Sequence, residues 1–250
     1  MSSPVPLVRR RAFTRIAAPL ERNRSTLKVL TSKAIRYDQG FNYAYFEGDL
    51  LDRVRKELKA RANEGLPVRF LDAGAGRGTG LLLAEAVSPN VVAHGLALHA
   101  PDPKLGIPGH KWTKGHFETG VFCDPKTGEG AFDVIQSRYA LQHAANHAMA
   151  LENLLNSLKV GGRLFNFHDS DRTAVHIEDT GFLPVLERQG FVLDEVSARS
   201  SRLGAFLRKV AGPIFVNSPR LYVIKRVGKD KADLSAFYGS ARINKVPLKK

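Results

Sequence analysis

A glycine-rich turn beside a carboxylate is the stretch of this sequence best suited to bind a small molecule. In FLDAGAGRGTG, residues 70–80, Asp72 stands two positions before Gly74, and Gly76 and Gly78 follow at alternate positions. Glycine lets a backbone approach a ligand closely, and the unpaired amides at the start of a following helix attract polar groups. The turn therefore predicts a nucleotide-type ligand held by the main chain.

Two common nucleotide-binding turns do not fit this spacing. A phosphate-binding loop needs Gly-Lys-Ser or Gly-Lys-Thr after its first glycine, and neither follows here. The dinucleotide pattern G-x-G-x-x-G, counted from Gly74, needs its third glycine where Thr79 stands. The pattern present is D-x-G-x-G-x-G, so a third kind of nucleotide site is indicated.

The elements that must position this turn alternate between strand and helix. Strands are predicted over 67–73, 90–98, 111–117, 131–137, 161–168, 191–198 and 220–226. Helices are predicted over 48–65, 79–88, 147–159 and 177–190. This alternation predicts an α/β fold with a parallel sheet covered by helices on both faces. Such sheets bind ligands beyond the carboxyl ends of their strands, where the glycine-rich turn stands.

The net charge of +14 is concentrated at the two ends of the chain. Residues 1–36 carry nine Lys/Arg and one acid (+8), residues 199–250 carry thirteen and two (+11), and residues 37–198 carry sixteen and twenty-one (−5). Basic ends suit a polyanion such as RNA or an anionic membrane surface, and solvated tails are the plain alternative. The predicted organisation is a basic N-terminal arm (1–36), one domain (37–228) and a basic C-terminal tail (229–250).

The rest of the composition narrows the class of protein. A chain of 250 residues can bury one large core. The single cysteine, Cys123, excludes an internal disulfide framework, and with scattered histidines it predicts no metal site. No apolar run reaches the roughly 18 residues of a membrane span. A cytoplasmic location is predicted, with a mitochondrial or other organellar one as the alternative, because the Arg-rich N-terminus has the composition of a transit peptide.

Three stretches resemble a known family in the right order and spacing. VRFLDAGAGRGTG resembles the first motif of class I S-adenosylmethionine-dependent methyltransferases, and AFDVIQSRYALQH is similar to the fourth-strand segment of that family. NLLNSLKVGGRLFNFH is similar to its next helix and fifth strand, and ERQGFVLDEV with RLYVIKR to its last two strands. The resemblance covers roughly 49–226. It implies a Rossmann-like seven-stranded sheet and S-adenosylmethionine as cofactor.

The resemblance also implies a set of cofactor contacts. The glycines would let the backbone lie against the methionine half of the cofactor, with Asp72 orienting the loop. The implied cofactor-binding residues are Asp72, Gly74, Gly76, Gly78, Ala97, Leu98, Phe117, Ser137 and Arg138.

Methyl transfer needs an acceptor that is positioned in line with the methyl group and then deprotonated. His168 and Asp169, after the fifth strand, are the predicted catalytic base pair, and a polar loop pair without a catalytic role is the alternative. His143 is interpreted as a local hydrogen-bonding residue. The aromatic stretch 36–48 is predicted to be either a lid over the cofactor or a cover for the sheet edge.

The sequence departs from the family at the adenosine end of the cofactor. The acid that usually holds both ribose hydroxyls is replaced by Ala97, so that Asp102 or His99 would have to reach the ribose. The acid that usually meets the adenine amino group is replaced by His116, with Glu118 two residues later. PDPKLGIPG also opposes the usual helix between the second and third strands. Weakened cofactor binding is therefore expected.

These patterns together predict an S-adenosylmethionine-dependent methyltransferase that acts on or near RNA or ribonucleoprotein, which it would contact through its basic arms. One alternative is a non-catalytic, methyltransferase-like RNA-binding or assembly factor that lost the acid at Ala97. A second alternative is a small-molecule methyltransferase, because the fourth-strand segment is closer to enzymes of that kind and lacks the Asn/Asp-Pro-Pro-Tyr/Phe motif of base-amino methyltransferases.

Overall fold

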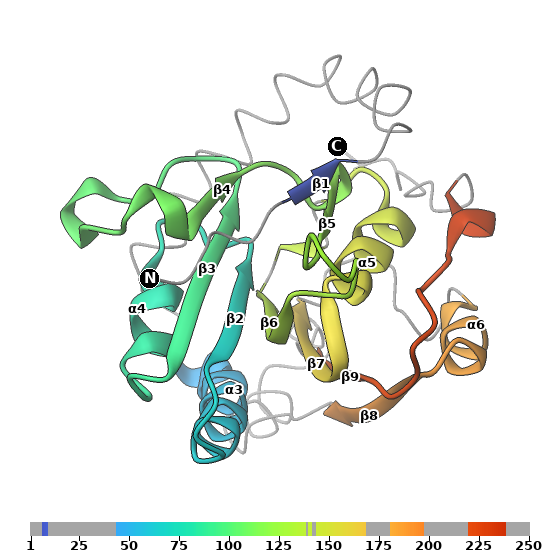
Figure 1. Ribbon diagram of the computed structural model, residues 1–250, viewed down its shortest axis with the longest axis horizontal. Coiled ribbons are helices and arrows are strands. Elements are labelled where there is room, and N and C mark those ends of the chain that lie inside the picture. Colours follow the sequence, from blue (N-terminus) through green and yellow to red (C-terminus); the bar gives the residue numbers. More distant parts are fainter. Residues whose placement is uncertain are drawn as a thin grey trace, which may run out of the picture.

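A computed structural model describes residues 7–9, 44–138, 140–141, 144–168, 181–197 and 220–238. The strands of the main sheet are β2 (Val68–Ala73), β3 (Val91–Ala97), β4 (Trp112–Lys114), β6 (Phe132–Arg138), β7 (Leu158–His168), β8 (Phe191–Ser197) and β9 (Arg220–Arg226). They follow the order β4-β3-β2-β6-β7-β9-β8, from left to right in Figure 1. β9 pairs antiparallel with both β7 and β8, and the other neighbouring strands of this sheet pair in parallel. The predicted seven-stranded α/β fold is confirmed.

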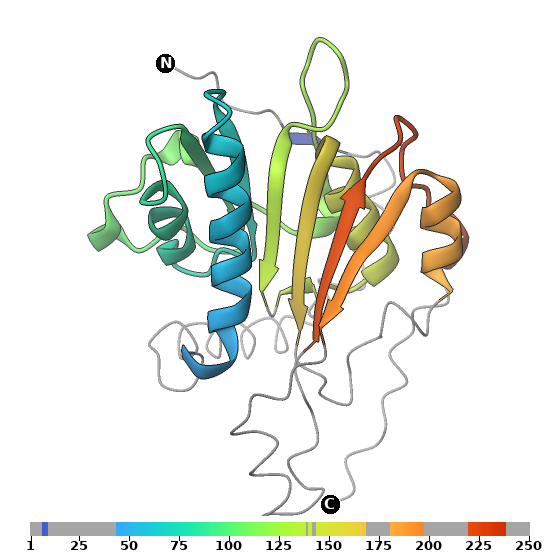
Figure 2. The ribbon, with the colours of Figure 1, turned by 90° about the horizontal axis from the view of Figure 1, so that it is seen from below.

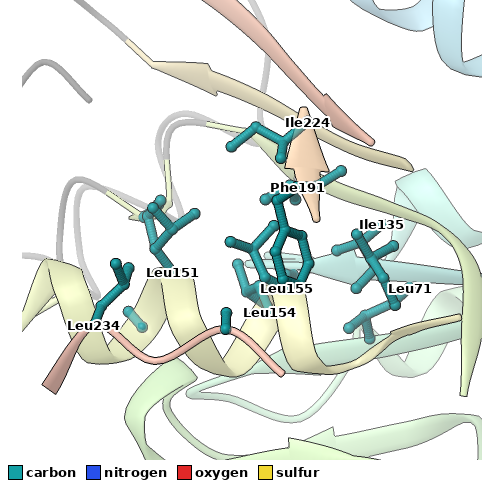
Figure 3. Close-up of a cluster of buried hydrophobic side chains, with 14 of the residues drawn as sticks. Leu71, Ile135, Leu151, Leu154, Leu155, Phe191, Ile224 and Leu234 are labelled. Carbon is teal, nitrogen blue, oxygen red and sulfur yellow. The ribbon is translucent and has the colours of Figure 1, made fainter. Parts of the chain in front are cut away.

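Helices cover both faces of this sheet. The α-helices of the described ranges are α3 (Ala44–Ala62), α4 (Thr79–Glu85), α5 (His147–Asn156) and α6 (Phe182–Arg188). α3 and α4 contribute Leu58 and Leu81 to a core on one face, and Figure 2 shows α3 lying along it. α5 and α6 close the other face, where Leu155 packs near Ile135 (Figure 3). Neighbouring strand residues point to opposite faces, so β2, β3, β6, β7 and β9 each supply residues to both cores.

Element boundaries differ from the predicted ones in understandable ways. α3 begins at Ala44, before the predicted start. α5 ends at Asn156 because the next residues already pair with β6: Phe132 lies opposite Leu158 in the sheet. The loop after β3 contains no α-helix, as expected, but it forms two short 3-10 turns, η1 (Pro103–Leu105) and η2 (Gly109–Lys111).

A small second sheet was not predicted. β1 (Leu7–Arg9) pairs antiparallel with β5 (Gly120–Phe122), which follows the 3-10 turn η3 (Phe117–Thr119). Both segments are three residues long, too short to show an alternating apolar pattern. Three residues of the basic N-terminal arm are therefore paired with the domain.

The first part of the C-terminal tail packs along α5. Leu234 is fully buried in the α5-side core, and its amide donates to Glu152 Oε2 at 2.8 Å. Asn156 exchanges two hydrogen bonds with the backbone of Ala232, at 2.7 and 2.9 Å. The hydroxyl of Tyr238 donates to Glu152 Oε2 at 2.6 Å. Residues 229–238 thus belong to the packed structure of the domain.

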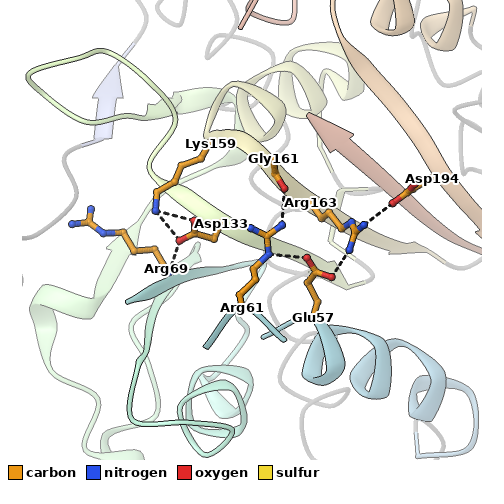
Figure 4. A network of polar contacts seen from close by, with 8 residues as sticks. All are labelled: Glu57, Arg61, Arg69, Asp133, Lys159, Gly161, Arg163 and Asp194. Carbon is orange, nitrogen blue, oxygen red and sulfur yellow. Dashed lines mark hydrogen bonds and ion pairs between the residues drawn. The ribbon is translucent and has the colours of Figure 1, made fainter. Parts of the chain in front are cut away.

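Several basic side chains of the body are neutralised internally (Figure 4). Glu57 of α3 binds Arg61 at 2.7 Å and also pairs with Arg163 of β7. Asp133 of β6 accepts from Lys159 at 2.8 Å and from the amide of Arg69 at 2.8 Å. This network joins α3 to the sheet, and its cations are occupied by these contacts.

None of the helices in the described ranges combines the length and apolar composition that crossing a membrane requires.

Candidate functional site

The glycine-rich turn is built at the carboxyl end of β2 and leads directly into α4. Gly74, Gly76 and Gly78 all have positive φ, at 91°, 54° and 103°. The amides of Gly74 and Ala75 donate to the carbonyl of Leu96 in β3, at 2.8 and 3.1 Å. The turn is therefore fixed by the neighbouring strand at the edge of the sheet where ligands bind.

Packing within the protein explains the two outer glycines. A Cβ on Gly74 would lie 2.1 Å from the Cβ of Ala140, and one on Gly78 would lie 2.3 Å from Cδ1 of Ile107. Close packing inside the protein therefore requires Gly74 and Gly78 whether or not a ligand is bound. Gly76 is half-buried, as Gly74 is, and its amide has no backbone acceptor among the described residues.

Asp72 lies in β2, two residues before the glycine-rich turn. Its carboxylate is buried, accepts from Gln136 Nε2 at 3.2 Å, and lies under the first turn of α4, where a Cβ on Gly80 would come within 2.1 Å of it. Asp72 and Gln136 are neighbours in the β2–β6 register, so the sheet brings them together. The carboxylate therefore packs between β6 and the start of α4, and its implied role in orienting the turn stays a prediction.

The end of β3 presents no acid toward a ribose among the described residues. Ala97 is 8% exposed and belongs to the core of the α3 and α4 face, and Leu98 after it is half-buried. Asp102, which the sequence offered as a substitute, caps η1 through the amide of Lys104 at 2.9 Å. It also lies 3.4 Å from Arg77 of the glycine-rich turn. The carboxylate of Asp102 is therefore engaged elsewhere.

Trp112 packs against the loop that contains Asp102. The indole N–H of Trp112 donates to the carbonyl of His99 at 2.7 Å, and its ring lies against Gly95 of β3. Because these contacts join positions far apart in sequence, no local pattern could have identified Trp112 or Ile107 as partners of the turn.

The two polar residues that follow β4, His116 and Glu118, differ in their burial and contacts. Glu118 is fully buried, and its Oε1 accepts from the amides of Ala145 and Asn146 before α5, at 2.7 and 3.2 Å. Glu118 therefore positions α5. His116 remains half-buried; burial lowers its pKa, and the nearby Glu118 opposes this in part. Phe117 packs beside Gly74, with Cζ 3.6 Å from the position of a Cβ there.

The residues after β6 and β7 are only partly described. Ser137, near the end of β6, is fully buried, and Arg138, the last residue of β6, is half-buried. His168 ends β7, opposite Arg220 of β9. Asp169, His143 and residues 36–43 of the aromatic stretch lie outside the described residues, whereas Tyr45 and Phe46 fall in α3. The catalytic pair and the lid remain predictions.

Within the described part of the chain, no group of three or more His, Cys, Asp or Glu side chains could hold a metal ion.

Comparisons with known proteins agree with this geometry. Residues 37–195 match the family model described as a methyltransferase domain. No curated protein matches the chain. Its fold is similar to an S-adenosylmethionine-dependent methyltransferase from Mesorhizobium loti, with a TM-score of 0.50, 14% identity, and coverage of 72% of this chain and 97% of that one.

A proposed S-adenosylmethionine-dependent methyltransferase from Listeria monocytogenes is similar as well, with a TM-score of 0.51, 13% identity, and coverage of 76% and 98%. At such identities the likeness to solved structures concerns the fold, and the family model carries the assignment. The chain belongs to the methyltransferase domain family, whose cofactor is S-adenosylmethionine.

Proposed function

We propose that the chain transfers the methyl group of S-adenosylmethionine to RNA, either free or within a ribonucleoprotein. The charge distribution supports this acceptor: the ends carry +8 and +11, whereas residues 37–198 carry −5. Body cations such as Arg61, Lys159 and Arg163 are paired with carboxylates. The unbalanced positive charge therefore lies at the ends, where it suits a polyanion.

The turn fits the methionine half of the cofactor. Gly76 offers an amide without a backbone acceptor among the described residues, and the amides of Gly74 and Ala75 fix the turn to Leu96 of β3. Ala97, Leu98 and Phe117 would line the adenosine part, while Ser137 and Arg138 stand at the end of β6 beside the turn. The cofactor supplies an activated methyl group when bound. The protein must then orient the acceptor and accept its proton.

His168 and Asp169 remain the proposed base pair for that proton. β7 is parallel to β6, and Arg138 lies opposite Phe167, the residue before His168, so His168 leaves the sheet at the same edge as Arg138. This edge is where the acceptor has to approach the methyl group. A base at this position could take a proton from an N–H or O–H acceptor.

A non-catalytic RNA-binding or assembly factor is the second candidate. It is favoured by the adenosine end of the site, where Ala97 replaces an acid and Asp102 is bound to Arg77. Glu118 is committed to the backbone before α5. Without cofactor binding, the preserved fold would serve only as a scaffold.

Calorimetric titration of S-adenosylmethionine into the full chain separates the two candidates. Binding is expected for the unchanged protein and at least a tenfold loss for Gly76→Val, whose side chain would occupy ligand space. Gly128→Val is the matched control, because Gly128 also has positive φ (67°) but nothing within 4 Å of its Cβ position. No heat from the unchanged protein would establish the scaffold candidate.

The acceptor is tested with unmodified tRNA and ribosomal RNA transcripts. Binding should weaken steeply with salt, and the logarithmic slope should become shallower in a full chain carrying Lys245→Gln, Lys249→Gln and Lys250→Gln. The control carries Arg55→Gln, Lys56→Gln and Lys59→Gln, which change three exposed cations of α3. Equal slopes in both variants, or binding to anionic vesicles in preference to RNA, would reject RNA as the partner.

A further inference from the structure

Two buried polar side chains on adjacent strands lack hydrogen-bond partners among the described residues. Ser137 of β6 is fully buried and Asn166 of β7 is 2% exposed. Neither Ser137 Oγ nor Asn166 Oδ1 has a partner within that part of the chain. Buried polar atoms of native proteins are almost always hydrogen-bonded, so two neighbouring exceptions require an explanation, of which a ligand is one.

The sheet places these two side chains side by side. Ser137 lies directly opposite Asn166 in the parallel β6–β7 register, and on its other side it lies opposite Ala73, the last residue of β2 before Gly74. Registered neighbours point to the same face and lie about 4.8 Å apart. Ala73 belongs to the core on the α5 side, so this is the face that the pair shares. Ser137 is therefore one strand, and Asn166 two strands, away from β2, which leads into the glycine-rich turn.

The pair also lies toward the carboxyl end of the sheet. The amide of Phe132, which begins β6, donates to the carbonyl of Ser157 just after α5, at 3.0 Å. The C-terminal end of α5 is thus near the amino end of β6. Asn146, at the N-terminal end of α5, therefore lies closer than Ser157 to the carboxyl edge of the sheet, where ligands bind. Ser137 is the next-to-last residue of β6, at that edge.

Two buried polar residues of the same kind, Asn156 and Ser157, are hydrogen-bonded within the protein. Asn156 uses both its amide nitrogen and its oxygen on Ala232. Ser157 Oγ accepts from the amide of Phe122 at 2.9 Å and donates to the carbonyl of Asn153 at 2.7 Å. Glu118 Oε2 and Asn153 Oδ1 are also buried without a partner in the described ranges. Ser137 and Asn166 differ from them in standing side by side on adjacent strands, near the carboxyl end of the sheet.

We infer that Ser137 and Asn166 orient the methyl acceptor by holding a neutral N–H or O–H group next to the methylated atom. A hydroxyl and an amide oxygen both accept hydrogen bonds, and neither carries a charge that would attract a phosphate. Ser137 and Asn166 lie on β6 and β7, the first and second strands beside β2, which leads into the glycine-rich turn. Both are positioning residues and form no covalent bond, and Ser137 is thereby assigned to the acceptor instead of to the cofactor, which the resemblance implied. This inference rests on the proposed function.

Stability distinguishes an unpaired group from a structural one. Ser137→Ala and Asn166→Leu should leave the melting temperature of the cofactor-free protein unchanged or raise it, because no protein partner is lost. The matched controls Ser157→Ala and Asn156→Leu remove paired groups and should lower it clearly. Losses in Ser137→Ala and Asn166→Leu equal to those of the controls would overturn the inference, since the two groups would then be structural or held by buried water.

Methylation kinetics then show whether the two side chains contact the acceptor or the cofactor. With the RNA transcripts as acceptors, Ser137→Ala and Asn166→Leu should each lower kcat/KM at least tenfold while the Kd for S-adenosylmethionine stays within twofold. A parallel loss of cofactor affinity would assign the pair to the cofactor and overturn the inference, as would unchanged kcat/KM in both variants. Failure of the unchanged protein to bind cofactor or to methylate any transcript rejects the proposed function itself, and the inference with it.

Discussion

The guanidinium of Arg77 lies 3.4 Å from the carboxylate of Asp102 and ties the glycine-rich turn to the loop after β3. The backbone repeats this link, because the amide of Asp102 donates to the carbonyl of Arg77 at 2.9 Å. The carboxylate closest in sequence to the missing ribose acid is thus part of the loop's own structure. Any gain at the ribose has to come from a new acid.

Installing that acid at Ala97 should strengthen the cofactor site. Ala97 is in register with the exposed Lys114 of β4, so an aspartate there has a cation nearby. Ala97→Asp is expected to improve S-adenosylmethionine binding by about 1–2 kcal/mol if both ribose hydroxyls are met. Calorimetry and thermal melts of both proteins measure this. A lower melting temperature without any binding heat would show that the position cannot serve a ribose.

Leu58 should be a major support of α3 on the sheet. It is fully buried in the core that joins α3 to β2, β6 and β7, together with Val54. Leu58→Ala is expected to lower the free energy of unfolding by roughly 2–4 kcal/mol, measured by urea denaturation. Lys59→Ala, on the exposed side of the same helix, is the control and should change it by less than about 0.5 kcal/mol. Equal values would mean that α3 does not pack as described.

Stability should fall in mild acid because of His94. This residue is buried in β3, bonded to Thr113 Oγ1 at 2.8 Å and packed edge-on against Phe122. Burial, and to a lesser extent the charge of His110, lowers the pKa of His94 from 6.5 to about 4. Between these values the unfolded chain binds more protons, so the stabilisation is complete above pH 6.5 and is lost as pH falls toward 4.

The size of the His94 effect is roughly 3 kcal/mol across that window. Urea denaturation from pH 4 to 8 should show it as a difference in slope between the unchanged protein and His94→Gln. His110→Gln should keep most of the slope, because burial is the larger cause of the lowered pKa. Parallel profiles for the unchanged protein and His94→Gln would contradict this account.

The part of the C-terminal segment up to Tyr238 should stabilise the domain. A chain ending at Gly228 loses the buried Leu234 and leaves Glu152 and Asn156 without the partners that residues 232–238 supply. It is expected to lose about 3 kcal/mol or more of unfolding free energy. A chain ending at Tyr238 keeps these contacts and is the comparison. Equal denaturation midpoints for the two shortened chains would show that residues 229–238 do not stabilise the domain.

Much of the fold followed from local patterns in the sequence. A few consecutive residues were enough to recognise three features: the apolar runs of β2 and β3, the periodic apolar residues of α3, and the turn from Asp72 to Gly78. Local physics fixes such features, because strand alternation, helical period and positive φ at glycine depend on a few consecutive residues. The carboxyl end of β2 was therefore predictable as the cofactor edge.

Only the tertiary structure decided what each polar residue of the site does. Asp102 and Glu118 have the right charge for a cofactor, yet one is bound to Arg77 and the other to the amides before α5. Ser137 and Asn166 are separated by a helix in sequence and become neighbours only when β6 pairs with β7. Pairing between strands and packing of loops join distant positions, and a hydrogen-bond partner is chosen by that proximity rather than by residue type.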